Sequence, residues 1–146
     1  MTLASADPGD HVDQLVALTE RLSALLAEQT RLFEARRPQD AATLTARSTE
    51  LATLYRRESA RLKADPRMIA GAPRVKRQRL VEATQAFDKV LARHGRSVYA
   101  AKTVTEGLIH AVAQEVARRR APAAGYGPRA RALSGDGSAI TLNRRA

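Results

Sequence analysis

The candidate side chains for catalysis or metal binding are three histidines and several carboxylates. His11, His94 and His110 lie on different predicted segments or faces, without the HxxxH or ExxH spacing of a metal site on one helix face. Glu106 and Glu115 are isolated, so no carboxylate pair is placed for general acid–base catalysis. We therefore predict no enzyme activity, no metal and no cofactor.

Other parts of the sequence also give no evidence of a catalytic or metal site. The chain has no cysteine, which excludes structural disulfides, cysteine-based zinc sites and thiol catalysis. The stretch SGDGSA (134–139) is a flexible turn that lacks the Lys-Ser/Thr ending of a phosphate-binding loop. His94 falls on a predicted helix seam, where a polar core or register-setting role is favoured over metal binding.

The composition favours a thin helical core over a thick globular one. Of the 146 residues 44% are hydrophobic, but aromatics make up only 3%, with two Phe and no Trp. A narrow Leu/Val/Ala seam in an elongated helical assembly fits these values. The start MTLASADPGD lacks the features of a secretory signal, and no stretch approaches the ~20 apolar residues of a membrane span. We expect a cytoplasmic protein.

Apolar periodicity predicts a helical hairpin over residues 10–64. A first helix from Asp10 to about Arg36 and a second from about Gln39 to Ala64 are separated by Pro38. The connector 65–73 should hold a single helical turn after Asp65 and Pro66. The seam of the first helix has the three-four spacing of a coiled coil: Leu15, Leu18, Leu22, Leu25, Gln29 and Leu32.

A third helix is predicted over residues 74–121, longer than either arm of the hairpin. Gly95 could kink or break it, but the seam keeps its register across the glycine, which favours a continuous helix. The fold class is therefore all-α: an elongated antiparallel three-helix coiled-coil bundle, made of a helical hairpin plus one long helix. Residues 1–9 should be a flexible N-terminus and residues 122–146 a disordered tail, because helical periodicity is absent from both.

The length of the third helix has a consequence for binding. If it runs beside the shorter hairpin, its last part keeps apolar side chains that the hairpin cannot cover, and we predict a partner-binding site there. A fold-back at Gly95 or Gly107, or pairing with a second copy, would also bury them. The predicted binding residues are Val104, Leu108, Ile109, Val112 and Val116.

The charge is uneven along the chain. The net charge is +10, yet residues 1–72 hold 10 basic and 10 acidic side chains, whereas residues 73–146 hold 15 and 5. The cluster formed by Arg74, Lys76, Arg77 and Arg79 makes a nucleic-acid or polyanion binder an alternative. The shortage of aromatic side chains for base stacking disfavours it.

Several stretches resemble a known family. The runs LVALTERLSALLAEQTRLFEARRPQD, LYRRESARLKADPRMIAGAP, ATQAFDKVLARHGRSVYAAKTVTEGLIHAVAQEV and the closing GYGP…ITLNRRA resemble the alphaproteobacterial flagellar proteins called FlbY. These are similar to FlgN, the type III export chaperone for the hook–filament junction proteins. The resemblance covers about residues 11–146, and its most specific pieces are RP after the first helix, LKADP, KTVTEGL and GYGP.

The resemblance implies a cytosolic chaperone that masks the terminal helices of the hook-associated proteins FlgK and FlgL. It would bring this cargo to the flagellar export apparatus. In FlgN-like chaperones the cargo site lies in the C-terminal part of the long helix, which by position implies Val104, Leu108, Ile109, Val112 and Val116 here. A tail tyrosine contacts the export gate in such chaperones, and Tyr126 is the corresponding residue in this chain.

Overall fold

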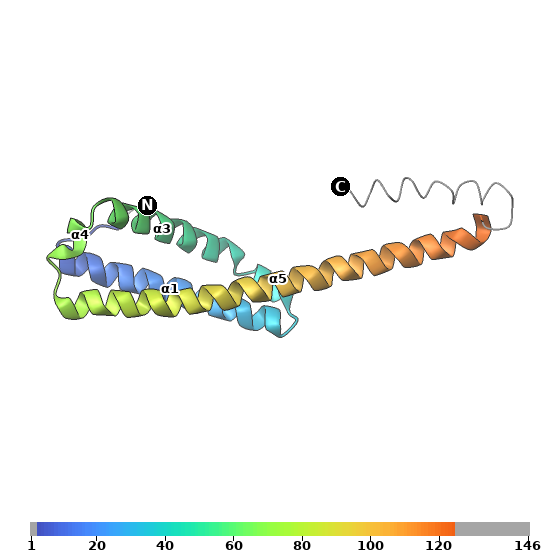
Figure 1. The fold of residues 1–146 in the computed structure, drawn as a ribbon, viewed down its shortest axis with the longest axis horizontal. Helices are drawn as coiled ribbons and strands as arrows, with labels where there is room; N and C mark the ends of the chain where they lie inside the picture. Colours follow the sequence, from blue (N-terminus) through green and yellow to red (C-terminus); the bar gives the residue numbers. More distant parts are fainter. Residues whose placement is uncertain (1–2, 125–146) are drawn as a thin grey trace. The chain divides into compact units, whose positions relative to one another are not determined.

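The computed structural model describes residues 3–124, and all regular secondary structure in this part of the chain is α-helical (Figure 1). This confirms the predicted all-α fold class. The chain divides into two units, one ending at Lys102 and one beginning at Thr103. The helices are α1 (Pro8–Glu34), α2 (Pro38–Ala42), α3 (Thr45–Ala64), α4 (Arg67–Ala70) and α5 (Arg74–Ala124).

Helix α1 begins two residues before the predicted start because Asp7 caps it. The Asp7 carboxylate accepts the backbone N–H of Asp10 at 2.7 Å, and Pro8 occupies the first helical turn, where its missing N–H costs nothing. The coiled-coil seam is buried except at one position, since Leu25 is only half-buried. The buried seam residues are Leu15, Leu18, Leu22, Gln29 and Leu32.

The end of α1 is a Schellman motif with an arginine in the left-handed position. Arg36 has a φ of 59°. Its N–H donates to the Phe33 carbonyl at 3.0 Å, and the Arg37 N–H donates to the Leu32 carbonyl at 2.8 Å. The motif satisfies the last carbonyls of the helix and turns the chain toward Pro38. A side chain with a Cβ is strained in this conformation, which glycine adopts freely.

The second predicted helix is interrupted, which corrects the expectation of one helix over residues 39–64. Helices α2 and α3 are separated at Thr43 and Leu44, whose N–H groups bond three residues back, to Asp40 and Ala41. The Thr43 hydroxyl also donates to the Asp40 carbonyl at 2.6 Å. The Gln29 side chain of α1 donates to the Ala41 carbonyl at 3.1 Å. The backbone bonds to the residue three positions back replace the α-helical bonds to the residue four positions back, so the chain forms a tighter turn between the two helices.

The connector contains the single turn that the sequence predicts. Asp65 accepts the N–H of Arg67 at 3.3 Å as α4 begins. Gly71 follows the helix in an ordinary right-handed conformation, with a φ of −82°. Ile69 of this turn packs against Val12, Val16 and Ala72, so it closes one end of the core.

The core of the first unit is a seam shared by α1, α3 and α5. At one end Val12 and Val16 pack with Leu80 and Ala83 of α5. Further along α1, Leu22 and Leu26 pack around the Phe87 ring. Three side chains of α3 complete that cluster, and the ring centroids of Tyr55 and Phe87 lie 4.7 Å apart. The α3 members are Leu51, Ala52 and Tyr55.

Two ion pairs show that α1 and the first part of α5 run in the same direction. Asp13 contacts Lys76 at 2.6 Å near the start of both helices. Near the end of α1, the Glu34 carboxylate receives two hydrogen bonds from Arg93, at 2.7 and 2.9 Å. These bonds lower the pKa of Glu34 below its ordinary value and raise that of Arg93. Helix α3 lies beside α1, runs in the opposite direction and leads into the connector (Figure 1).

Helix α5 continues through Gly95, as the unbroken seam predicts. A Cβ added at Gly95 would meet no atom within 4 Å, so packing does not require glycine there. The helix ends at Ala124, three residues beyond the predicted end at Ala121. The predicted disordered tail therefore begins too early, at residue 122, and its residues 125–146 lie outside the described part of the chain.

The N-terminal segment that was expected to be flexible is hydrogen-bonded to the bundle. Leu3 donates its N–H to the Glu58 carboxylate at 3.2 Å, and the Ser5 hydroxyl lies 3.2 Å from Nδ1 of His11. Glu58 is fully buried and also accepts two hydrogen bonds from Arg61, at 2.9 and 3.1 Å. Because buried polar groups need partners, these bonds hold residues 3–7 as a strap over α1 and α3.

We predict that Arg36→Gly stabilises the first unit. Removing the Cβ relieves the strain of the left-handed conformation, which raises the free energy of unfolding. This gain should exceed the loss caused by the greater entropy of the unfolded chain by up to about 1 kcal/mol. Urea unfolding followed by circular dichroism measures the change. Arg37→Gly is the matched control, since Arg37 has a φ of −117° and gains nothing from glycine. Equal or lower stability of Arg36→Gly would contradict the strain argument.

We predict that His94 makes stability depend on mildly acidic pH. Its ring packs edge-on against Phe33, with centroids 6.4 Å apart, and burial lowers its pKa below the ordinary 6.5. The neutral form is therefore favoured in the folded state, so this stability is complete above pH 6.5 and is lost as the pH falls below it. As the pH is lowered through that range, the unfolding temperature should fall more for the wild type than for His94→Gln. Identical pH profiles would exclude the effect.

Candidate functional site

The five predicted binding residues are exposed on α5. Every residue from Lys102 to Arg120 is exposed, and none of these side chains enters the two core clusters. The exposed fractions are Val104 66%, Leu108 63%, Ile109 64%, Val112 56% and Val116 45%.

Helical geometry gathers these five side chains on one face, which we call the apolar face. At about 100° per residue they fall within an arc of roughly 140°. The opposite side of the helix carries Glu106, His110 and Gln114, and the side chains of His110 and Gln114 lie 3.1 Å apart. The segment is therefore an amphipathic helix whose apolar face is in contact with water.

Charged side chains follow the apolar face at its C-terminal end. Glu115 forms ion pairs with Arg118 at 3.5 Å and with Arg119 at 3.1 Å. All three side chains are largely exposed, so these pairs contribute little to stability. These charged side chains mark the C-terminal limit of the apolar face. The face is therefore about three helical turns long, which is the length of an ordinary helix–helix contact.

Other exposed apolar side chains were not predicted. Tyr99 is 72% exposed and Val75 is 74% exposed, and neither lies on the seam used to place the core. The sequence could have indicated their exposure only through their positions outside the apolar three-four spacing of the helix. An exposed apolar side chain has no functional meaning by itself. Tyr126, the residue implied as an export-gate contact, lies outside the described residues.

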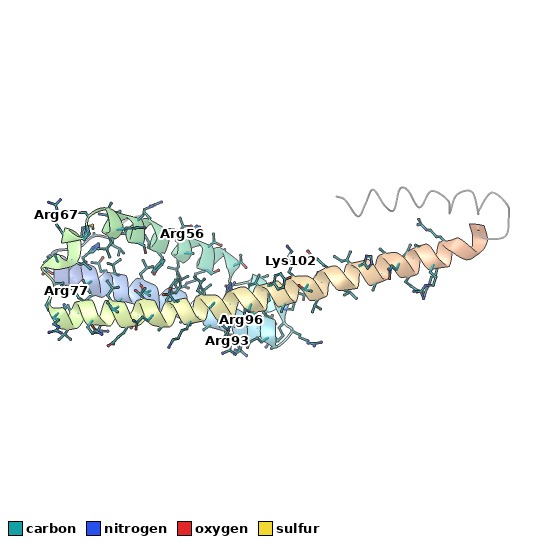
Figure 2. All side chains as sticks on the ribbon, in the orientation of Figure 1. Arg56, Arg67, Arg77, Arg93, Arg96 and Lys102 are labelled. Atoms are coloured by element: carbon teal, nitrogen blue, oxygen red, sulfur yellow. The ribbon has the colours of Figure 1, made fainter. Side chains whose placement is uncertain are left out.

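The basic cluster at the start of α5 is not a uniform cationic surface. Lys76 is held by Asp13, which raises the pKa of the lysine above its ordinary value. Figure 2 shows Arg67 on α4 and Arg77 on α5 at one end of the first unit, Arg56 on α3, and Arg93 further along α5. Phosphate binding along a nucleic acid needs several cations on one surface, so this distribution does not favour it.

The three histidines of the described residues lie in different surroundings. No group of three or more His, Asp or Glu side chains there is placed to hold a metal ion. His11 is buried beside Ser5, His94 faces Phe33, and His110 is exposed. No helix in the described range combines the length and apolarity needed to cross a bilayer.

These observations define the class: an all-α bundle protein whose distinctive surface is an exposed amphipathic helix. Over an alignment of 151 residues the chain is 51% identical to the flagellar basal-body protein FlbY of Caulobacter vibrioides, with all of both chains covered. The chain belongs to the FlbY-type family of flagellar proteins, which confirms that part of the predicted resemblance. No family model and no solved structure matches it.

We predict that the apolar face contributes little to the stability of the monomer. Leu108→Ala should change the free energy of unfolding by less than about 0.5 kcal/mol, because the leucine is exposed. Leu22→Ala, which removes the same atoms from the core, should cost about 2–5 kcal/mol. Urea unfolding of both variants makes the comparison. A large loss for Leu108→Ala would mean that the apolar face is covered within the monomer.

Proposed function

We propose that this protein is a flagellar export chaperone whose apolar face binds an amphipathic helix of its cargo. The observation that carries the proposal is the exposure of five large apolar side chains on one side of a regular helix. Contiguous apolar surface of this kind on a monomer is typical of an interaction site. A cargo helix would lie along it in the helix-in-groove manner, with its own apolar face turned inward.

Burial of the apolar face would make a favourable contribution to binding a cargo helix. The five side chains are 45–66% exposed, so covering what remains of them would contribute about 4–9 kcal/mol, at roughly 1.5–3 kcal/mol for complete burial of each. Association and the ordering of side chains offset a large part of this.

The cargo that we propose consists of the hook-associated proteins FlgK and FlgL, whose terminal helices would be masked until export. Membership in a family of flagellar proteins supports this assignment, and so does the position of the apolar face in the last part of the long helix. The protein would act in the cytoplasm, without enzyme activity, and would deliver its cargo to the export gate. Tyr126 is proposed as a contact with that gate.

The test compares two lysine substitutions on opposite sides of α5. Val112→Lys places a charge in the middle of the apolar face and should weaken binding of purified FlgK or FlgL at least about tenfold, because the lysine must be desolvated. Gln114→Lys adds the same charge on the other side and should leave the affinity unchanged. Isothermal titration calorimetry measures both, with circular dichroism to verify equal helix content.

Three outcomes would contradict the proposal. Equal affinities for the two variants would mean that the apolar face is not the cargo site. Failure of the wild type to bind either hook-associated protein would remove this cargo. A wild type that sediments as a dimer and a Val112→Lys variant that sediments as a monomer would assign the apolar face to a second copy.

A further inference from the structure

We propose that the helix bound at the apolar face lies antiparallel to α5 and carries acidic side chains in its first turn, which contact the arginines at the C-terminal end of the face. This inference rests on the proposed function, because it takes a partner helix as the occupant of the apolar face. Its starting point is a run of three exposed arginines directly after the face. We call these residues the arginine cluster: Arg118, Arg119 and Arg120.

Helical spacing places one member of the arginine cluster in line with the apolar face. Arg119 follows Val112 by seven residues, about two turns, and Leu108 by eleven, about three turns. It therefore lies on the same side of α5 as these two side chains. Arg118 and Arg120 lie to either side of that line, each about 100° away from it. A helix that covers the apolar face and continues for one more turn must pass the arginine cluster.

The arginine cluster carries more positive charge than its acidic neighbour neutralises. Glu115 forms ion pairs with Arg118 at 3.5 Å and with Arg119 at 3.1 Å. Three arginines beside one glutamate leave two positive charges in excess. Glu106, the other acidic residue of 103–124, precedes Arg118 by twelve residues, which is about 18 Å along the helix. That distance exceeds the screening length of about 8 Å at physiological salt.

The macrodipole of α5 does not account for the arginine cluster. A positive side chain is favoured by the C-terminal end of a helix only within about the last turn. Helix α5 ends at Ala124, and its last turn contains no basic residue. The arginines also contribute little to the stability of the monomer, since the Arg118 and Arg119 side chains are 76% and 80% exposed. Their charge is therefore available to a partner that carries the opposite charge.

The charge on the rest of this segment favours a helix over a lipid surface as that partner. An amphipathic helix that binds an anionic membrane carries lysine and arginine along its polar face. The side of α5 opposite the apolar face carries Glu106, His110 and Gln114 instead. Positive charge is thus confined to one end of the apolar face, which matches a partner whose negative charge is confined to one end as well.

The confinement of charge also gives the direction of the partner helix. Helices commonly carry acidic residues in the first turn, because these interact favourably with the positive end of the helix dipole. The acidic end of the partner is therefore its N-terminal end. Because the arginine cluster follows the apolar face toward the C-terminus of α5, a partner that contacts the cluster with its first turn runs antiparallel to α5.

The direction is tested with full-length protein and a synthetic peptide of about 18 residues, or five helical turns. The peptide has leucines at three-four spacing, glutamates in its first turn and a nitroxide label on a cysteine at its N-terminal end. Its binding should broaden the NMR amide signals of residues 116–120 more than those of residues 104–108. The same peptide labelled at its C-terminal end is the matched control and should give the reverse pattern. Equal broadening of the two ranges by both peptides, or the parallel pattern, would overturn the direction.

The charge recognition is tested with the double variant Arg118→Gln and Arg120→Gln, which keeps the Glu115–Arg119 pair. Isothermal titration calorimetry compares two unlabelled peptides, one with the first-turn glutamates and one with glutamines in their place. The wild type should bind the glutamate peptide about fivefold more tightly, and the double variant should bind both peptides equally. Any difference in helix content between the peptides is the same for both proteins, so the change in this ratio reports the arginines. The preference should also be lost at about 1 M NaCl.

Two further results would overturn the inference. An unchanged fivefold preference in the double variant would mean that the arginine cluster does not read the acidic turn. Binding of neither peptide, together with sedimentation of the wild type on phosphatidylglycerol vesicles, would assign the apolar face to a lipid surface. The proposed function fails separately: if the peptides bind as expected but FlgK and FlgL do not bind, the cargo is wrong and the charge recognition stands.

Discussion

The packing of Phe87 against α1 and α3 is the interaction on which the rest of the structure depends. The chain has two phenylalanines and no tryptophan, so few side chains can fill space between three helices. Phe87 contacts Leu22 and Leu26 on one side and Tyr55 on the other. It thereby sets the register of α5 against α1, with Asp13–Lys76 and Glu34–Arg93 holding the register on either side. That register determines which residues of α5 are buried within the first unit.

Much of the fold could be predicted because a coiled-coil seam is a local property of the sequence. The spacing of Leu15, Leu18 and Leu22 identifies the buried stripe of α1 without any knowledge of its neighbours. The interruption at Thr43 could not be predicted in this way. The hydrogen bonds there come from Thr43 and Leu44 to residues three positions back and from Gln29 of α1 to Ala41, and a periodicity argument does not include such contacts. The three-four spacing of the second helix also places Glu58 on the buried stripe, as the structure has it, but that spacing does not show that the backbone of Leu3 is its partner.

The apolar face was predictable from a different kind of reasoning, a comparison of helix lengths. Its five residues are exposed in the structure. The comparison places the surface but does not name what binds it, because amphipathic helices of many proteins share the same spacing. Family membership narrows the biological setting to the flagellum. The polar seam residues of the first unit, Gln29 and His94 among them, weaken its core slightly and favour one register over others.

The strap formed by residues 3–7 has a practical consequence for studies in living cells. The N–H of Leu3 is within hydrogen-bond distance of a buried carboxylate, so the beginning of the described chain is part of the folded bundle. A fluorescent reporter joined immediately before Leu3 would have to leave the bundle past Glu58, and its linker would pull on that bond.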